Sequence, residues 1–210
     1  KFIEETKMSK SQADLHQFIS LLASIFDNYH RHVFLFGKIK QILFYYKNEI
    51  NTYFSNIELF NVFQNNNLIL LFLIENEFLI LNDSILDLLK YSKRFFYPEI
   101  KNTLENDLSI QISNEQLEID EFFYEKRRIG ENDLYICSLI RQDSIEDFVS
   151  YVNRINLKLT SKISSSIYET NSFLIDKTPT LIEYAVFFGS IQIFNYLRLN
   201  QVELTSSLWL

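Results

Sequence analysis

Three histidines and a single cysteine are the side chains in this sequence with the greatest potential for metal binding or nucleophilic chemistry. Two of the histidines, His30 and His32, are one residue apart in a polar segment, and two histidines at this spacing can bind one metal ion. No third ligand lies nearby in the sequence, so surface histidines are the simpler interpretation. Cys137 stands next to Ile136 and near Leu139 on a predicted helix, which favours a small core residue over a reactive thiol. We therefore expect no metal site and, with one cysteine, no internal disulfide.

Carboxylates could supply general acids or bases, but their positions in this chain fit helix ends instead. Four acidic residues between positions 118 and 125 precede the cations of Lys126–Arg128, an order that matches the dipole of one helix at both ends. No glycine-rich nucleotide loop, paired-histidine zinc motif or nucleophile elbow occurs in the sequence. We therefore expect a protein that is not an enzyme and has no cofactor, with an enzyme of unrecognised site as the remote alternative.

One segment mixes basic and aromatic side chains as nucleic-acid-binding surfaces do. Residues 31–47 contain Arg31, Lys38, Lys40 and Lys47 together with Phe34, Phe36, Phe44 and Tyr45. Such cations can contact phosphates while the rings stack on bases. The formal net charge of the whole chain is −7, however, and an acidic protein is repelled by nucleic acid. A buried aromatic face beside a solvated basic face is therefore favoured, and we expect no nucleic-acid partner.

The composition favours helices. Only 3 glycines and 2 prolines occur among 210 residues, and both β-sandwiches and Rossmann-type enzymes need more turn glycines than this. Hydrophobic residues make up 47% of the chain, which is enough for a real core. The uninterrupted apolar run Leu68–Ile74 is too short to span a bilayer and predicts a helix buried on nearly all sides. We therefore predict an all-α, cytoplasmic protein with no membrane partner.

Apolar residues at helical spacing predict an irregular helical domain over residues 1–106. Ser9 with Gln12, and Ser55 with Glu58, are spaced as capping boxes that begin helices. The predicted helices carry these apolar stripes: Leu15, Phe18, Ile19, Leu22, Phe26 and Tyr29 in the first; Leu35, Ile39, Ile42, Tyr46, Ile50 and Tyr53 in the second; Ile57, Phe60 and Phe63 in the third; and Ile85, Leu88 and Leu89 in a later one that Asn82 or Asp83 caps.

The domain boundary is predicted where helical spacing stops. Leu108, Ile110 and Ile112 alternate with polar neighbours, so residues 107–117 are expected to form an extended linker, with a short strand as the alternative. Residues 118–210 then form the second domain. The chain does not begin with methionine and stops inside a motif, so we expect a fragment that is truncated at the C-terminus.

Two short apolar helices separated by one glycine organise the second domain. They occupy residues 180–197, with Gly189 between them. Gly189 is expected to have a positive φ, since a tight helix-turn-helix needs a backbone conformation that glycine adopts without strain. Ala185 is small enough to let two helices approach closely. A unit of this size cannot bury its own apolar faces, which implies stacking neighbours.

The spacing of this segment resembles an ankyrin repeat, whose pattern runs T-P-L-H-x-A-A-x-x-G-H-x-x-I-V-x-L-L. With Ala185 and Gly189 as anchors, Thr180–Glu183 aligns with T-P-L-H. The departures are Thr178-Pro179, which lies two residues early; Glu183, in place of histidine; and Gln201, where a helix-terminating glycine is usual. The loose pattern is most similar to the divergent ankyrin-repeat families of single-celled protists, which Ile136–Arg141, Tyr168–Leu174 and Leu208–Leu210 also fit.

A second, degenerate helix pair precedes the first. Superposing Asp143–Ile145 on Gly189–Ile191 aligns the two pairs at a separation of 46 residues, whereas the ankyrin period is about 33. The surplus falls in residues 153–177, where we predict an additional short helix around Ile163–Thr170. Asn132 or Asp133 is predicted to cap the first helix of this earlier pair. The resemblance implies helix-turn-helix solenoid repeats.

The resemblance also implies a non-catalytic scaffold that binds an unknown protein partner. In ankyrin arrays the loop tips and the end of the inner helix form the binding face, and the aligned positions here are Asp176, Lys177, Pro179, Phe187 and Phe188. Two exposed adjacent phenylalanines would suit a binding hot spot. The alternative is that one or both rings pack into the preceding repeat or the insertion.

A second hypothesis concerns the N-terminal half. Solenoids need end units with polar outer faces, so residues 1–106 could form a structural helical cap or a self-association module. Homo-association is then expected through residues 10–55 or through the exposed C-terminal end.

Overall fold

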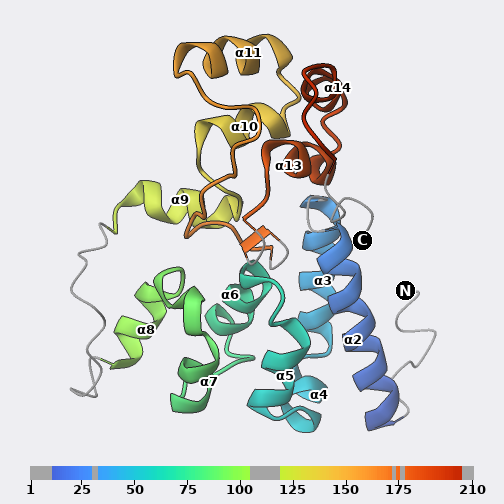
Figure 1. Ribbon diagram of the computed structural model, residues 1–210. Helices are drawn as coiled ribbons and strands as arrows, with labels where there is room; N and C mark the ends of the chain where they lie inside the picture. The colour runs from blue at the N-terminus through green and yellow to red at the C-terminus, as the bar shows by residue number, and fades with distance from the viewer. Residues whose placement is uncertain (1–10, 30–32, 105–118, 172–173, 176–177, 205–210) are drawn as a thin grey trace. The chain divides into compact units, whose positions relative to one another are not determined.

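The computed structural model describes residues 11–29, 33–104, 119–171, 174–175 and 178–204. Within these residues all regular secondary structure is helical, apart from isolated bridge residues such as Lys162 and Thr180, so the predicted all-α fold class is confirmed (Figure 1). The chain divides into two compact units, Lys1–Asp120 and Glu121–Leu210. The predicted linker, residues 107–117, lies outside the described residues.

Unit 1 is an irregular helical bundle. Its helices are α2 (Gln12–Tyr29), α3 (Val33–Tyr45), α4 (Lys47–Tyr53), α5 (Asn56–Phe63), α6 (Asn67–Glu75), α7 (Asp83–Leu88), the 3-10 helix η1 (Lys90–Arg94) and α8 (Tyr97–Leu104). One hydrophobic core joins them, and it includes Leu15, Ile19, Phe26, Ile39, Leu43, Ile50, Phe63, Leu73, Ile85 and Phe96. Helix α6 exposes little of its surface in this core, as the run Leu68–Ile74 predicts.

Side-chain caps begin four of these helices, and at α6 the Asn66 side chain accepts a hydrogen bond from the Leu68 N–H at 2.9 Å. Ser55 and Glu58 form the predicted capping box, with the Ser55 N–H donating to the Glu58 carboxylate at 2.8 Å. Asn82 caps α7. At the start of α2 the Ser11 hydroxyl accepts a hydrogen bond from the Asp14 N–H at 3.2 Å, while Ser9 lies outside the described residues.

The predicted second helix of unit 1 is divided in two. The backbone at Tyr46 has φ −98° and ψ 16°, outside the α-helical region, and α4 begins after it. The Tyr46 ring is buried, so packing of this ring accompanies the break. Tyr53, which continuous helical spacing places on the buried stripe, is instead 42% exposed. A continuous helix through Tyr53 was therefore a wrong prediction.

Unit 2 is built from two helix pairs preceded by one helix. The helices are α9 (Glu121–Ile129), α10 (Tyr135–Arg141), α11 (Ile145–Arg154), α13 (Leu181–Phe188) and α14 (Ile191–Leu199). α10 pairs with α11 and α13 with α14, while α10 packs on α13 and α11 on α14 (Figure 1). Their shared core includes Cys137, Leu139, Ile140, Phe148, Ile163, Ile182, Tyr184, Ala185, Ile193 and Leu197.

Two local predictions for unit 2 need correction. No helix occurs in the described residues around Ile163–Thr170; this segment is a loop whose backbone bonds to side chains and to distant backbone, as described below. At the first helix pair, Asn132 does not cap α10 directly, because helix α10 starts at Tyr135, three residues later, and its N-cap position, Leu134, has no side-chain cap. The side-chain carbonyl oxygen of Asn132 instead accepts a hydrogen bond from the Leu134 N–H at 3.1 Å.

Candidate partner-binding surface

The turns inside the two helix pairs of unit 2 have the same backbone geometry. Asp143 has φ 52° and Gly189 has φ 67°, both left-handed, so the predicted positive φ of Gly189 is confirmed. The next residues match closely, with φ/ψ of −81°/80° at Ser144 and −81°/82° at Ser190. The superposition at a separation of 46 residues therefore pairs residues of equal conformation.

Hydrogen bonds repeat along with these dihedral angles. The Ser144 N–H donates to the Leu139 carbonyl at 3.0 Å, and the Ser190 N–H donates to the Ala185 carbonyl at 2.8 Å. This six-residue closure is the Schellman arrangement, which satisfies carbonyls at the end of a helix. Both inner helices thus end by the same device.

The outer helices also end alike. Asn156 follows α11 with φ 51° and Gln201 follows α14 with φ 59°. The next amide closes each turn, from Leu157 to the Val152 carbonyl at 3.0 Å and from Val202 to the Leu197 carbonyl at 3.1 Å. At Gln201 the ankyrin pattern described above would have glycine, a residue that adopts such a left-handed backbone without strain. Unit 2 therefore contains two copies of one helix-turn-helix design.

Two side chains join the copies at this turn. The Asp143 carboxylate accepts hydrogen bonds from the backbone N–H groups of Gln192 and Ile193, each at 3.0 Å. These amides belong to the first turn of α14, where a negative charge is stabilised by the helix dipole. The Ser190 hydroxyl is thereby left to donate to the Ile140 carbonyl of the first pair. The second outer helix is capped by the first repeat.

The start of α13 carries its own cap. The Thr180 N–H donates to the Glu183 carboxylate at 2.7 Å, and the Thr180 hydroxyl accepts from the Glu183 N–H at 3.4 Å. This capping box gives Glu183 a structural role. Glu183 stands at the position where the ankyrin pattern has histidine. A serine or threonine three residues before a glutamate is the signal that identified Ser55 and Glu58. The same signal could have identified Thr180 and Glu183 as a capping box.

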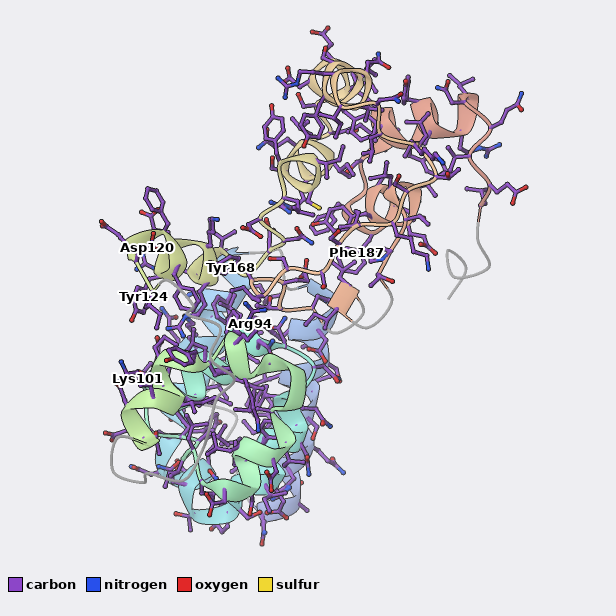
Figure 2. All side chains as sticks on the ribbon, turned by 60° about the vertical axis from the view of Figure 1, so that its left-hand side comes forward. Arg94, Lys101, Asp120, Tyr124, Tyr168 and Phe187 are labelled. Atoms are coloured by element: carbon purple, nitrogen blue, oxygen red, sulfur yellow. The ribbon has the colours of Figure 1, made fainter. Side chains whose placement is uncertain are left out.

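The loop between the helix pairs folds back onto this start. The Ile163 N–H donates to the Pro179 carbonyl at 2.7 Å, and the Leu181 N–H donates to the Ser161 carbonyl at 3.2 Å. Tyr168, farther along the loop, lies against α9 with its ring centroid 5.7 Å from that of Phe123 (Figure 2). The loop is therefore part of the packed unit.

A polar network links the loop to the inner helices. Arg141 donates from Nη1 to the Asn132 carbonyl at 2.8 Å and to the Tyr184 hydroxyl at 2.9 Å. Its Nε lies 2.7 Å from the Glu131 carboxylate. Because Arg141 belongs to α10 and Tyr184 to α13, the guanidinium connects the two helix pairs. Neither residue was identified as part of a network from the sequence, since the contact spans 43 positions.

Glu169 is the buried carboxylate of the same region. Its oxygens accept from the N–H groups of Thr170 at 3.0 Å, Asn171 at 3.1 Å and Asn132 at 3.3 Å. Burial raises the pKa of Glu169 above its ordinary value, although these three N–H donors act in the opposite direction. The Thr170 hydroxyl donates to the Gly130 carbonyl at 2.7 Å, which ties the loop to the end of α9.

The interior beside this network offers little room for a ligand. A cavity of about 10 Å³ lies there, lined in part by Asn132, Ser166, Glu169 and Tyr184, and such a space accommodates about one water molecule. Cys137 is fully buried, and burial raises the pKa of its thiol to about 12, which makes it a poor nucleophile at neutral pH. Among the described residues, no three His, Cys, Asp or Glu side chains lie together as a metal site. His30 and His32 are outside those residues.

The five residues predicted to bind a partner differ in their accessibility. Pro179 is buried, and Phe188 is 7% exposed, with its ring centroid 4.5 Å from that of Tyr184. Phe187, on α13, is half-buried, with its centroid 5.1 Å from that of Phe188 (Figure 2). Asp176 and Lys177 lie outside the described residues. Of the two adjacent phenylalanines, only Phe187 keeps part of its ring at the surface.

Other apolar side chains of the second helix pair are more exposed than their counterparts in the first. Val186 is 40% exposed, whereas Ile140, its equivalent 46 positions earlier, is fully buried. Ile191 is 68% exposed, whereas Ile145 packs partly against the core. The first pair buries these positions against the second pair. Neither Ile191 nor Val186 was singled out from the sequence as an exposed residue, and the segment Leu208–Leu210 lies outside the described residues.

No family model matches this chain, and neither a curated protein nor a solved structure matches it at the significance level applied. In the part of the chain that the structure describes, no helix combines the length and the apolar character needed to cross a membrane.

Proposed function

We propose that this protein is a non-catalytic scaffold for protein–protein interaction, with unit 2 acting as a divergent ankyrin-type module in the cytoplasm. The observation that carries the proposal is the duplicated helix-turn-helix with matching left-handed residues at Asp143 and Gly189. Duplicated helix pairs that stack side by side form extended surfaces, and repeat proteins use such surfaces to bind other proteins.

The proposed contact surface is the C-terminal end of α13 and the loop that precedes it. Phe187 supplies a half-buried aromatic ring, the kind of side chain that dominates binding free energy at protein interfaces. Asp176 and Lys177 of the preceding loop are proposed as polar contacts to the same partner. Phe188 and Pro179 are buried, so neither is proposed as a direct contact.

Proximity labelling with the full-length protein in cells tests the proposal. We expect Phe187→Gln to remove a defined set of labelled proteins, and the loss must occur with the melting temperature near that of the wild type. The matched control is Phe122→Gln, because Phe122 of α9 is 67% exposed and lies outside the proposed surface. If both variants label the same proteins as the wild type, Phe187 is not a contact residue and the proposal fails.

A second candidate function is that unit 1 is a structural cap or a self-association module. Unit 1 supports this role because it has a separate hydrophobic core built from its own helices. It also keeps large apolar side chains at the surface, among them Phe34 at 78% exposure. Sedimentation analysis of the 210-residue chain separates the two roles, since a cap leaves the chain monomeric and a self-association module does not.

A further inference from the structure

Helix α3 of unit 1 has apolar side chains on both of its faces. Ile39 and Leu43 are buried in the core. On the opposite side, Phe34 is 78% and Tyr45 is 53% exposed. Large aromatic side chains gathered on an exposed face are a feature of interaction sites. The outward face of α3 is therefore a candidate interface.

Gly37 is an independent sign of close approach at this face. It lies in the middle of α3, is exposed, and has no atom within 4 Å of the position that a Cβ would occupy. Its φ is not in the left-handed range, so neither backbone conformation nor packing within the described residues requires glycine here. Glycine is the least favourable residue after proline inside a helix. Room for another chain to approach is the remaining physical use of this position.

The order of side chains on the face is symmetric. Phe34, Lys38, Gln41 and Tyr45 follow one another at intervals of four, three and four residues, which places them on one stripe. The stripe runs aromatic, polar, polar, aromatic. If it is turned end over end, aromatic residues fall on aromatic residues and polar residues on polar ones. Contacts between identical subunits related by a twofold axis require this kind of self-complementary surface.

We propose that two copies of this chain associate through antiparallel packing of their α3 helices. Phe34 of one copy lies opposite Tyr45 of the other, and Lys38 lies opposite Gln41. The Phe44 ring, 48% exposed at the edge of the stripe, then fits over Gly37 of the other copy. Large side chains that enter spaces left by small ones are the basis of close helix packing.

The distribution of charge favours the same surface. The chain has a formal net charge of −7, so most approaches between two copies are repulsive. Helix α3, Val33–Tyr45, contains no carboxylate. Its Lys38 ammonium lies 5.3 Å from the Phe34 ring centroid of the same helix, an arrangement that attracts a cation to an aromatic face. A contact between two α3 helices therefore brings no carboxylates of these helices together.

Sedimentation equilibrium of the 210-residue chain over a range of concentrations tests the proposal, which deepens the self-association candidate and is independent of partner binding by unit 2. The wild type is expected to show a monomer–dimer equilibrium. Gly37→Leu should raise the dissociation constant at least roughly tenfold by filling the space for Phe44. Because leucine favours helix more than glycine does, the same variant should melt no lower than the wild type. Phe34→Ser should weaken the dimer similarly, and Phe122→Ser in unit 2 is the matched control without effect.

A cysteine substitution tests the antiparallel register. In this register the two Gln41 Cα atoms lie close enough for a disulfide, which needs a separation below about 7 Å. Gln41→Cys is expected to form a disulfide-linked dimer on mild oxidation. Gln17→Cys on the exposed face of α2 should not, and Cys137 is buried and does not interfere.

The outcomes separate this proposal from the function on which it rests. A chain that stays monomeric up to on the order of 100 μM overturns both the α3 interface and the self-association role. A dimer that is unaffected by Gly37→Leu and by Phe34→Ser overturns the α3 interface alone, because the chain then associates through another surface.

Discussion

The carboxylate of Asp143 accepts a hydrogen bond at 3.0 Å from the backbone N–H of Ile193, a residue 50 positions later in the chain. Through this bond the turn of one helix pair caps the outer helix of the next. The arrangement gives Asp143 two separable tasks, because its own backbone is also left-handed, with φ 52°.

Substitutions at Asp143 should separate these tasks. Asp143→Gly removes the cap and relieves the backbone, so we expect a loss of about 1 kcal/mol or less in the free energy of unfolding. Asp143→Ala removes the cap and keeps an L-residue in the left-handed region. We therefore expect it to lose about 1–2 kcal/mol more of the free energy of unfolding than Asp143→Gly does. Urea unfolding of both variants measures the difference. Equal losses would mean that the backbone at Asp143 is not strained.

Gly189→Val should destabilise through the backbone alone. Gly189 has φ 67° and nothing within 4 Å of the position of a Cβ, so the Cβ itself meets no neighbouring atom. We expect a loss of about 1–3 kcal/mol, because an L-residue is strained in the left-handed region. Gly37→Ala is the control, since Gly37 is helical, and alanine there should stabilise by about 0.5–1 kcal/mol. Thermal unfolding checks both signs, and a stable Gly189→Val variant would contradict the turn geometry.

The capping box of α13 should behave as one unit. We expect Thr180→Ala to cost about 1 kcal/mol, typical for the loss of a helix N-cap. Glu183→Ala should remove the reciprocal hydrogen bond at Thr180 N, which is 2.7 Å long. The double variant should therefore cost less than the sum of the single variants. Strictly additive losses in chemical denaturation would show that the two side chains act separately.

Glu169 should make the free energy of unfolding fall as the pH rises. A carboxylate whose pKa is lowered on folding, such as Glu58, has the opposite effect. Burial raises its pKa in the folded state above the ordinary value of 4.5, so the folded chain holds the proton more tightly than the unfolded chain. Its contribution to the free energy of unfolding is therefore largest below pH 4.5 and falls as the pH rises through the folded-state pKa.

Comparison with Glu169→Gln isolates this contribution. The variant lacks the titrating group, so the difference in unfolding free energy between it and the wild type should change over the pH range just above 4.5. Urea unfolding at a series of pH values provides the measurement. Two parallel pH profiles would show that Glu169 titrates normally in the folded chain.

Local signals predicted much of the fold. Helices with one apolar stripe, such as α2, and the continuous apolar helix α6 follow from spacing alone. The capping box at Ser55 and the left-handed Gly189 also follow from neighbouring residues, because the groups that stabilise them are within four positions. Such features depend on short stretches of chain and can be predicted from them.

Features that depend on distant contacts could not be predicted. The segment predicted as a helix at Ile163–Thr170 is a loop whose hydrogen bonds go to distant partners. The Ile163 N–H donates to the Pro179 carbonyl, 16 positions away, and the Thr170 hydroxyl donates to the Gly130 carbonyl, 40 positions away. The burial of Phe188 depends on Tyr184 and on the Arg141 guanidinium, which lies 5.9 Å from its ring centroid. Residue types at one position do not reveal which distant side chain will cover them.

Four turns end the helices of the two pairs, at Asp143, Asn156, Gly189 and Gln201, and all four are left-handed. Glycine occupies only one of them, so a search pattern keyed to glycine spacing detects a single turn of this unit. The other three are maintained by hydrogen bonding and packing at a local cost of about 1–2 kcal/mol each. Two helix pairs can therefore share one backbone conformation at their turns while their residue types show no periodicity that such a pattern would find.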